Sequence, residues 1–197
     1  AENIKNLADS LLNIINDILI LSKIEAGKLK IIPNTFSLQQ TIKSITDIFA
    51  IAARQKNIQI LPVINPAIPT YIKTDENRIK QVINNFVSNA LKFTDNGSIT
   101  IKATPIESTS TKIKIKIEII DTGIGIKENE QQKLFQDFSQ IDASYTRNSE
   151  GTGLGLHICK KIISIMQGEI GLISKEGNGS NFWFTFEAEK INNAHTE

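Results

Sequence analysis

The sequence predicts an α+β fold, a two-layer α/β sandwich preceded by one long helix of a helical bundle. Apolar residues recur three and four positions apart through residues 1–26, as they do on a bundle helix. Two later segments, 98–103 and 112–119, alternate apolar and polar residues without a break. Such alternation means that one face of the sheet is buried and the other is exposed to solvent. This is typical of a mainly antiparallel sheet covered by helices on one side.

Length and composition limit the classes of function. The chain has 197 residues, of which 40% are hydrophobic, enough for one sizeable core and a flanking element. Its 22 Lys and Arg nearly balance 21 Asp and Glu, so no global field would draw it to nucleic acid or to an anionic membrane. The single cysteine, Cys159, fits a reducing compartment, and no apolar run approaches the roughly 20 residues of a membrane span. We therefore expect a cytoplasmic fragment with no nucleic-acid partner and no direct membrane contact, any membrane anchor lying upstream.

The first helix carries an apolar face that is too wide for an isolated surface helix. One seam runs from Ile4 to Leu21, and a second stripe centred on Ile15 lies beside it. This width favours a helix inside a four-helix bundle whose partner helices are missing from the chain. The alternative, a helix packed on its own domain, is disfavoured by Gly27 and Pro33, which separate the helix from the rest of the chain.

The remaining elements are predicted from periodicity and from turn residues. We expect further helices at 37–53, 76–94 and 153–166, the second with Asp75 as its N-cap and Asn96-Gly97 closing it. We expect strands at 29–32, 58–64, 71–73, 169–174 and 180–187 besides the alternating hairpin. The polar segment 122–150, between two glycine motifs, has the profile of a mobile lid. The predicted boundaries are 1–28 for the bundle helix, 29–190 for the sandwich domain and 191–197 for a polar tail.

A polar stripe on the helix at 76–94 is the first candidate for a functional surface. Its members are spaced by three or four and so share one face: Arg78, Gln81, Asn85, Asn89 and Lys92. Asparagines are poor helix formers, which favours a ligand over a merely solvated face. Two amide oxygens one turn apart can help to hold a hydrated Mg²⁺ among phosphates, and a lysine one turn later can reach a phosphate.

Two glycine motifs offer sites for a flat ligand and for phosphate. Asp121 ends a strand and is followed by Gly123 and Gly125, which permit close approach, while its carboxylate can accept the exocyclic amine of adenine. The alternative is a plain Asp-Gly turn. The run 151–156 opens a helix whose free N–H groups and dipole favour phosphate, although it lacks the context of a dinucleotide fingerprint. A last cluster, 177–184, has the pattern of a turn entering an alternating strand.

In this order the motifs resemble the nucleotide-binding boxes of sensor histidine kinases of the GHKL superfamily, which have the Bergerat-type ATP-binding fold. The N box is QVINNFVSNALKFT, the first G box is DTGIGI and the F box is KLFQDF, and GTGLGL and GNGSNFWF complete the set. The first helix resembles the second helix of the dimerisation and histidine-phosphotransfer bundle, so the match covers essentially the whole chain. The stretch FSQIDASYTRNSEGTGLGL looks most like hybrid histidine kinases, in which a receiver domain often comes next.

The resemblance implies a site for ATP or ADP with Mg²⁺. It implies that the phosphates and metal meet Asn85, Asn89 and Lys92, that Phe93 flanks the nucleotide, and that Asp121 reads adenine. It gives the base pocket to Gly123, Gly125 and Ile126, with Thr185 supporting the adenine side. The hinge of the lid would be Gly151, Thr152, Gly153, Leu154, Gly155 and Leu156. Arg147 is the candidate lid cation, the alternative being an exposed loop arginine, and Phe135 and Phe138 would fasten the lid.

The resemblance also separates kinases from ATPases. Gyrase, mismatch-repair and chaperone ATPases carry a glutamate general base four residues before the Mg²⁺-binding asparagine, and this sequence has Asn85 there. An amide cannot take a proton from water at neutral pH, so phosphoryl transfer to a positioned nucleophile is favoured over fast hydrolysis. The acceptor histidine, followed by an acid, is expected on a helix before Ala1, since neither His157 nor His195 qualifies.

The sequence therefore predicts the catalytic ATP-binding domain of a protein-histidine kinase of two-component signal transduction, unable to autophosphorylate by itself. For the intact protein we expect a homodimer formed through the helical bundle and a response-regulator receiver domain as partner. Two alternatives stay open. One is a non-catalytic nucleotide-binding dimerisation and scaffold module, and the other is a GHKL-type ATPase clamp.

Overall fold

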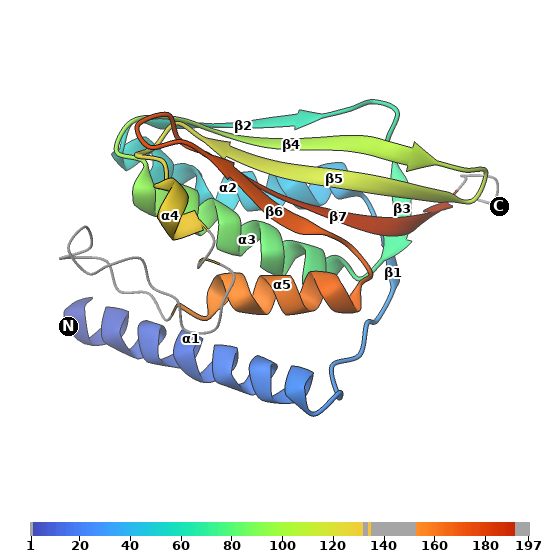
Figure 1. Ribbon diagram of the computed structural model, residues 1–197, viewed down its shortest axis with the longest axis horizontal. Helices are drawn as coiled ribbons and strands as arrows, with labels where there is room; N and C mark the ends of the chain where they lie inside the picture. The colour runs from blue at the N-terminus through green and yellow to red at the C-terminus, as the bar shows by residue number, and fades with distance from the viewer. Residues whose placement is uncertain (1, 132–133, 135–152, 192–197) are drawn as a thin grey trace.

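The structure is a computed structural model that describes residues 2–131, 134 and 153–191 (Figure 1). Its helices are α1 (Glu2–Glu25), α2 (Leu38–Gln55), α3 (Glu76–Phe93), α4 (Glu128–Gln131) and α5 (Gly155–Ile165). Its strands are β1 (Asn34–Phe36), β2 (Ile58–Ile64), β3 (Tyr71–Thr74), β4 (Gly97–Ser108), β5 (Lys112–Asp121), β6 (Ile170–Ser174) and β7 (Ser180–Ile191). The helices predicted at 37–53, 76–94 and 153–166 are thus confirmed to within two residues at each end.

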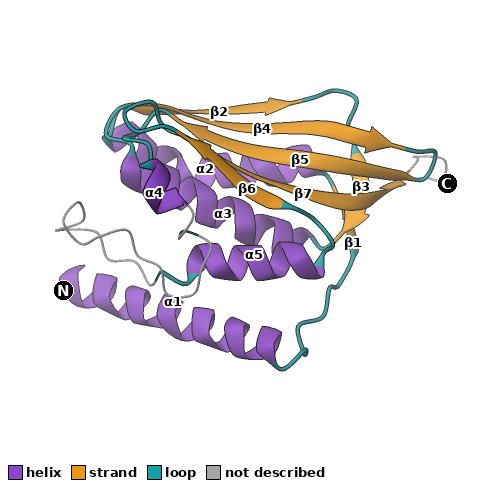
Figure 2. Cartoon of the chain, viewed as in Figure 1, coloured by secondary structure: helices purple, strands orange, loops and turns teal. Residues whose placement is uncertain are grey.

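The strands form one sheet with helices on one face only (Figure 1, Figure 2). Their order is β1-β3-β7-β5-β4-β2, with β6 beside β7, and β2–β4 is the parallel pair among the described strands. The helices α2, α3 and α5 lie along one face of the sheet, and α1 lies against α5 on the side away from the sheet. The predicted two-layer α/β sandwich with a preceding long helix is confirmed.

The alternating hairpin builds the core face of the sheet. In β5 the side chains of Ile113, Ile115, Ile117 and Ile119 are at most 1% exposed, whereas the intervening lysines point to the other face. From the helix layer Phe86 of α3 meets two rings of β7, with ring centroids 5.3 Å from Phe182 and 6.0 Å from Phe184. This aromatic contact fixes which face of α3 points into the core.

The first strand lies later in the chain than predicted. We expected a strand at 29–32, but β1 begins at Asn34 and pairs with β3. Pro33 has no N–H to give to a strand partner, and the N–H of Ile32 is taken by Asp75 Oδ2 at 2.8 Å. The segment from α1 to β1 is therefore a connection tied to the start of α3.

The two ends of α3 are held in different ways. Asp75 is its N-cap, as predicted, and its side chain accepts from Arg78 N at 3.1 Å. The predicted closure by a left-handed glycine is wrong, because the helix ends at Phe93 and Gly97, with φ +115°, begins β4 instead. Lys56 Nζ from the end of α2 donates to Leu91 O at 2.8 Å, so a terminal carbonyl is satisfied by a lysine rather than by a glycine cap.

One face of α1 packs on the domain and another does not. Near its end, Ile20, Leu21 and Ile24 pack against the core beside α5. A second set of its apolar side chains is 37–57% exposed: Leu11, Leu12, Ile14, Ile15, Ile18 and Leu19. Leu21, which we expected in the bundle seam, thus packs on the domain instead. The second set of apolar side chains still forms a wide exposed face. Among the described helices none is long and apolar enough to cross a membrane.

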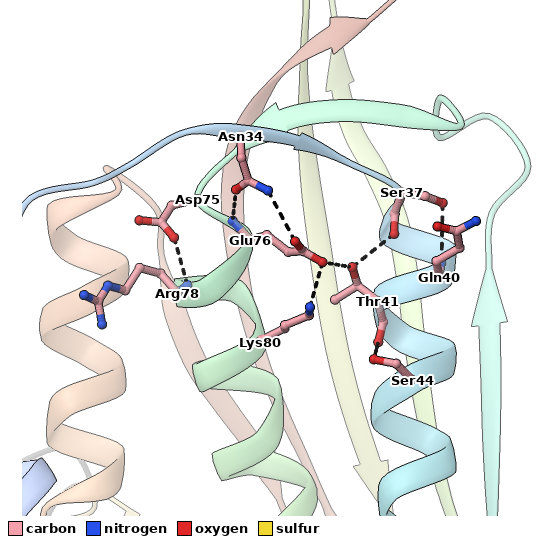
Figure 3. Close-up of polar contacts among 9 residues, drawn as sticks. All are labelled: Asn34, Ser37, Gln40, Thr41, Ser44, Asp75, Glu76, Arg78 and Lys80. Carbon is pink, nitrogen blue, oxygen red and sulfur yellow. Dashed lines mark hydrogen bonds and ion pairs between the residues drawn. The ribbon is translucent and has the colours of Figure 1, made fainter.

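The start of α3 ties the connecting segment to α2, as Figure 3 shows. Glu76 N donates to Asn34 Oδ1 at 3.2 Å, and Asn34 Nδ2 donates back to Glu76 Oε2 at 3.3 Å. Thr41 Oγ1 donates to Glu76 Oε1 at 2.8 Å, and Lys80 Nζ lies 2.8 Å from the same oxygen. One carboxylate therefore joins β1, α2 and α3.

This carboxylate makes the stability of the fold depend on pH. Burial raises the pKa of Glu76, but the hydrogen bonds from Lys80, Thr41 and Asn34 outweigh burial and hold the pKa below its ordinary 4.5. The ionised form therefore stabilises the fold above that value, and its contribution is lost as the pH falls through the lowered pKa. We expect Glu76→Gln to reduce the free energy of unfolding by roughly 1 kcal/mol at pH 7, as charged hydrogen bonds become neutral ones.

Urea unfolding of both proteins from neutral pH downward tests this expectation. The difference between them should shrink below pH 4.5, where the wild-type carboxylate begins to protonate. The control is Asp47→Asn on α2, whose carboxylate pairs with Lys43 in solvent and should change stability by less than about 0.5 kcal/mol. A difference that stays constant down to low pH would contradict the role assigned to the Glu76 carboxylate.

Candidate functional site

The polar face of α3 brings the two predicted asparagines together and sets Asn85 against the start of α5. Asn89 Nδ2 donates to Asn85 Oδ1 at 3.2 Å, and both residues are half-buried. Earlier on the stripe Arg78 Nη1 donates to Gln81 Oε1 at 2.9 Å. A Cβ built on Gly155 would lie 2.1 Å from Asn85 Nδ2, so a glycine is what allows the backbone of α5 to approach this amide.

The last turn of α3 carries Lys92 and Phe93 at the edge of the same face. Lys92 Nζ lies 5.2 Å from the centroid of the Phe93 ring, and partial burial lowers the pKa of the Lys92 ammonium. The Phe93 ring is 36% exposed, and its carbonyl oxygen accepts from Ile124 N at 3.2 Å. The end of α3 is therefore attached to the loop after Asp121.

Asp121 lies at the end of β5 and is only 6% exposed. Its Oδ1 accepts from Gly123 N at 2.8 Å and from Ser180 N at 3.2 Å. Burial raises the pKa of the Asp121 carboxyl, and these two backbone hydrogen bonds reduce the rise. Within the described part of the chain no donor reaches Oδ2, so this oxygen is the acceptor that the carboxylate can offer to a ligand.

The glycines after Asp121 are required by close backbone packing. A Cβ on Gly123 would lie 2.9 Å from both Asp121 Oδ1 and Thr94 Oγ1, and a Cβ on Gly125 would lie 2.0 Å from Lys175 O. Gly125 also has a φ of +67°, a conformation that a side chain disfavours. Thr94 Oγ1 is buried and has no hydrogen-bond partner among the described residues. The loop therefore lies tightly between α3 and the turn before β7.

Thr185 is not brought to this part of the site. The register pairs Asp121 with Ser180 and Lys116 with Thr185, so alternation along β7 points Thr185 to the opposite face of the sheet. There its Oγ1 accepts from Glu169 N at 2.9 Å. Its predicted role beside adenine is therefore wrong, and Ser180 occupies the place next to Asp121.

Sequence reasoning missed Ser180 and its neighbour Ser174. The hydroxyls of these two residues lie 3.0 Å apart at the adjoining ends of β6 and β7. Ser174 Oγ also accepts from Ile126 N at 2.9 Å and thereby connects the loop after Asp121 to the end of β6. The signal was present, because Ser180 comes directly after Gly179 and has the same strand phase as Phe182, which points into the core.

The glycine loop at 151–156 is described only from Gly153 onward. Gly153 has a φ of +69°, Leu154 is 4% exposed, and Gly155 and Leu156 begin α5. The N-cap position of α5 is taken by Leu154, whose apolar side chain makes no capping hydrogen bond. The remaining predicted lid residues lie outside the described part of the chain: Phe135, Phe138, Arg147, Gly151 and Thr152.

Comparisons with known proteins agree with this geometry. Residues 74–190 match a family described as histidine kinase-, DNA gyrase B-, and HSP90-like ATPase. The chain is 42% identical over 181 residues to the signal transduction histidine-protein kinase BarA of Escherichia coli (strain K12) and 43% identical over 187 residues to the sensor histidine kinase GacS of Pseudomonas protegens. These matches cover 92% and 95% of this chain, and the chain spans 20% of the length of each relative.

Solved structures share the fold. Full-length ShkA in complex with AMPPNP superposes with a TM-score of 0.83 at 26% identity, covering 96% of this chain and 38% of that one. The catalytic domain of the histidine kinase ThkA superposes with a TM-score of 0.62 at 30% identity, covering 79% of this chain and 95% of that one.

The fold and the site define a nucleotide-binding domain. The chain belongs to the family of histidine kinase-, DNA gyrase B- and HSP90-like ATPases, which its residues 74–190 match. Within that family it is a catalytic domain of the histidine-kinase type, since BarA, GacS and ThkA are histidine kinases. The resemblance predicted from the ordered motifs is confirmed.

The contact between Gly155 and Asn85 yields a first test of the site. We expect Gly155→Ala to displace the Asn85 amide and to weaken binding of Mg-ADP by about tenfold or more, as displaced metal-site supports do. Stability should be unchanged or higher, because alanine favours a helix over glycine by up to about 1 kcal/mol. Calorimetric titration with Mg²⁺ and with EDTA, together with thermal unfolding, measures both effects.

The matched control is Ser164→Ala on the exposed face of α5, which should change neither quantity. If Gly155→Ala bound Mg-ADP as tightly as the wild type, Asn85 would lie outside the metal and phosphate site.

Proposed function

We propose that the chain binds Mg-ATP and transfers the γ-phosphoryl group to a histidine of a bundle helix, as the catalytic domain of a sensor histidine kinase in two-component signalling. The observation that carries this proposal is that two surfaces of different chemistry lie next to each other along α3. Asn85, which is bonded to Asn89, lies against the start of α5, and the buried carboxylate of Asp121 lies beyond the last turn of α3. One surface suits phosphates with a cation, and the other suits a base.

The base end is supported by the free acceptor of Asp121. Because Oδ1 already receives two backbone N–H groups, Oδ2 is the oxygen left to accept the exocyclic amine of adenine. A buried carboxylate accepting such a bond gains more than an exposed one, because water competes less. Phe93, exposed beside the loop after β5, offers a ring face to the nucleotide.

The phosphate end is supported by the chemistry of its donors. Amide oxygens are hard ligands that suit Mg²⁺, which usually keeps several waters and takes further oxygens from the phosphates. Asn85 and Asn89 would hold the ion, which supplies charge neutralisation for the transferring group. Lys92 and the first N–H groups of α5 add donors for phosphate oxygens. Arg147 remains our candidate for the cation of the lid.

Transfer to a protein side chain is favoured over hydrolysis. Asn85 occupies the position where the ATPase clamps carry a glutamate, and an amide cannot act as the general base. His157 lies on α5 and is only 7% exposed, so it is not presented as an acceptor. The exposed apolar face of α1 is the surface we assign to the bundle that would carry the acceptor histidine and form the homodimer. A receiver domain is the proposed phosphoryl acceptor downstream.

The base site is tested by Asp121→Asn. The asparagine oxygen can still accept from Gly123 N and Ser180 N, but an amide NH₂ replaces the acceptor that faces the ligand amine. We expect ADP affinity to fall by about 1 to 3 kcal/mol, the cost of losing a buried charged hydrogen bond. Isothermal titration measures it, with Asp47→Asn as the surface control. Unchanged affinity would mean that the base lies elsewhere.

The transfer step is tested by supplying an acceptor helix in trans. The chain is mixed with a longer form of the protein that bears the acceptor helix and that carries Asp121→Asn to disable its own site. With labelled Mg-ATP, acid-labile phosphate should then appear on the longer form. This labelling should be lost when the 197-residue chain also carries Asp121→Asn. Rapid steady-state ATP hydrolysis without transfer would instead support an ATPase clamp. Nucleotide binding with neither transfer nor hydrolysis would support a scaffold module.

A further inference from the structure

The hydroxyl of Ser174 connects three segments of the base end. Ile126 N donates to Ser174 Oγ at 2.9 Å, Ser174 Oγ donates to Gly179 O at 2.9 Å, and Ser180 Oγ lies 3.0 Å from Ser174 Oγ. In the sheet Ser174 pairs with Ser180, and Ser180 pairs with Asp121, so the three side chains form one row on the same face. One strand, β7, therefore separates Ser174 from the Asp121 carboxylate, to which we assign binding of the base.

Which serine donates to the other follows from what a hydroxyl can do: it donates one hydrogen bond and accepts up to two. We assign the single proton of Ser174 to Gly179 O, because the other donor to that carbonyl, Lys175 N, is at a long 3.5 Å. One acceptor position of Ser174 is used by Ile126 N. With that assignment the remaining position accepts from Ser180, so the proton of Ser180 points at Ser174.

The position of Ser174 is itself fixed by α4. Gln131 Nε2 donates to Ser174 O at 3.0 Å and to Ile126 O at 2.8 Å, so one side-chain amide joins the end of β6 to the loop after Asp121. Ser180 is 7% exposed, and its N–H is bound to Asp121 Oδ1. These contacts hold the backbone of both serines in place, so the two hydroxyls stay within hydrogen-bond distance of each other.

We propose that Ser174 is a positioning residue that influences the choice of nucleotide base: by holding the Ser180 proton, it makes Ser180 Oγ an acceptor beside Asp121. This inference rests on the proposed function of the site. With its proton committed, Ser180 Oγ offers lone pairs, as Asp121 Oδ2 does. A base with an exocyclic amine can donate to these oxygens. A base with a carbonyl at the same position leaves buried acceptors facing each other, and unpaired buried groups discriminate strongly.

The test compares ADP with inosine diphosphate, whose base has a carbonyl in place of the exocyclic amine and a proton on the neighbouring ring nitrogen N1. Dissociation constants for both nucleotides are measured by calorimetry on the 197-residue chain and on Ser174→Ala. In the variant the Ser180 hydroxyl is free to rotate and to donate to the carbonyl. We expect the preference for ADP over inosine diphosphate to fall by roughly fivefold, the value of one neutral hydrogen bond.

Two further variants separate positioning from mere folding. Ser174→Thr keeps the hydroxyl, and Ser174→Val has the shape of the threonine variant without a hydroxyl. The threonine variant should therefore keep the wild-type preference for ADP, and the valine variant should lose it. This comparison holds even if Ser174→Ala fails to fold. In a Ser180→Ala background, Ser174→Ala should produce no further change in the preference, because its effect passes through the Ser180 hydroxyl. Ser44→Ala on α2, which removes a local helix hydrogen bond, is the control and should leave the preference unchanged.

The outcomes separate this inference from the function on which it rests. Failure of the wild-type chain to bind ADP would overturn the proposed function. ADP binding with a preference that Ser174→Ala and Ser174→Val leave unchanged would overturn the inference alone, even if both variants melt earlier. Additive effects of Ser174→Ala and Ser180→Ala on the preference would also overturn it.

Discussion

The structure depends on the packing of α3 across the sheet. Phe86 meets Phe182 and Phe184, and this contact fixes the rotation of the helix. Since successive residues of a helix are about 100° apart, a shift of one position would turn Asn85 and Asn89 away from the start of α5. The same helix holds the connecting segment at its beginning, through Asp75 and Glu76, and the loop after Asp121 at its end. One core contact thus positions both ends of the site.

The two ends of the site use different physical means. The proposed phosphate end has half-buried amides, one lysine and the backbone of a helix start, so its charge is small. The proposed base end has a buried carboxylate with one oxygen bonded to two backbone N–H groups. This local arrangement is consistent with a formal net charge of only +1, since no long-range field is needed to bind an anion at a built site. Glycines serve both ends by letting backbones come within reach of side chains.

Predictions from the sequence succeeded where a local pattern carries the information and failed where a distant partner decides. The alternation at 112–119 and the N-cap at Asp75 are local features, and both are confirmed. The strand expected at 29–32 failed because a carboxylate far along the chain takes the N–H of Ile32. The end of α3 lies within one residue of its predicted place, but the closure by Asn96-Gly97 failed because Lys56 from another helix satisfies a terminal carbonyl. The role of Thr185 was implied by the family resemblance, whereas the strand register places Ser180 beside Asp121.

By itself the sequence determined the layer architecture, the family and most of the candidate site, because side-chain periodicity and the order of the glycine motifs are properties of the chain alone. Only the tertiary structure decided that Gly155 lies against Asn85, that one face of α1 packs beside α5, and that Ser174 stands behind Ser180. These contacts join residues far apart in the chain, so their geometry depends on register and packing that no local pattern encodes.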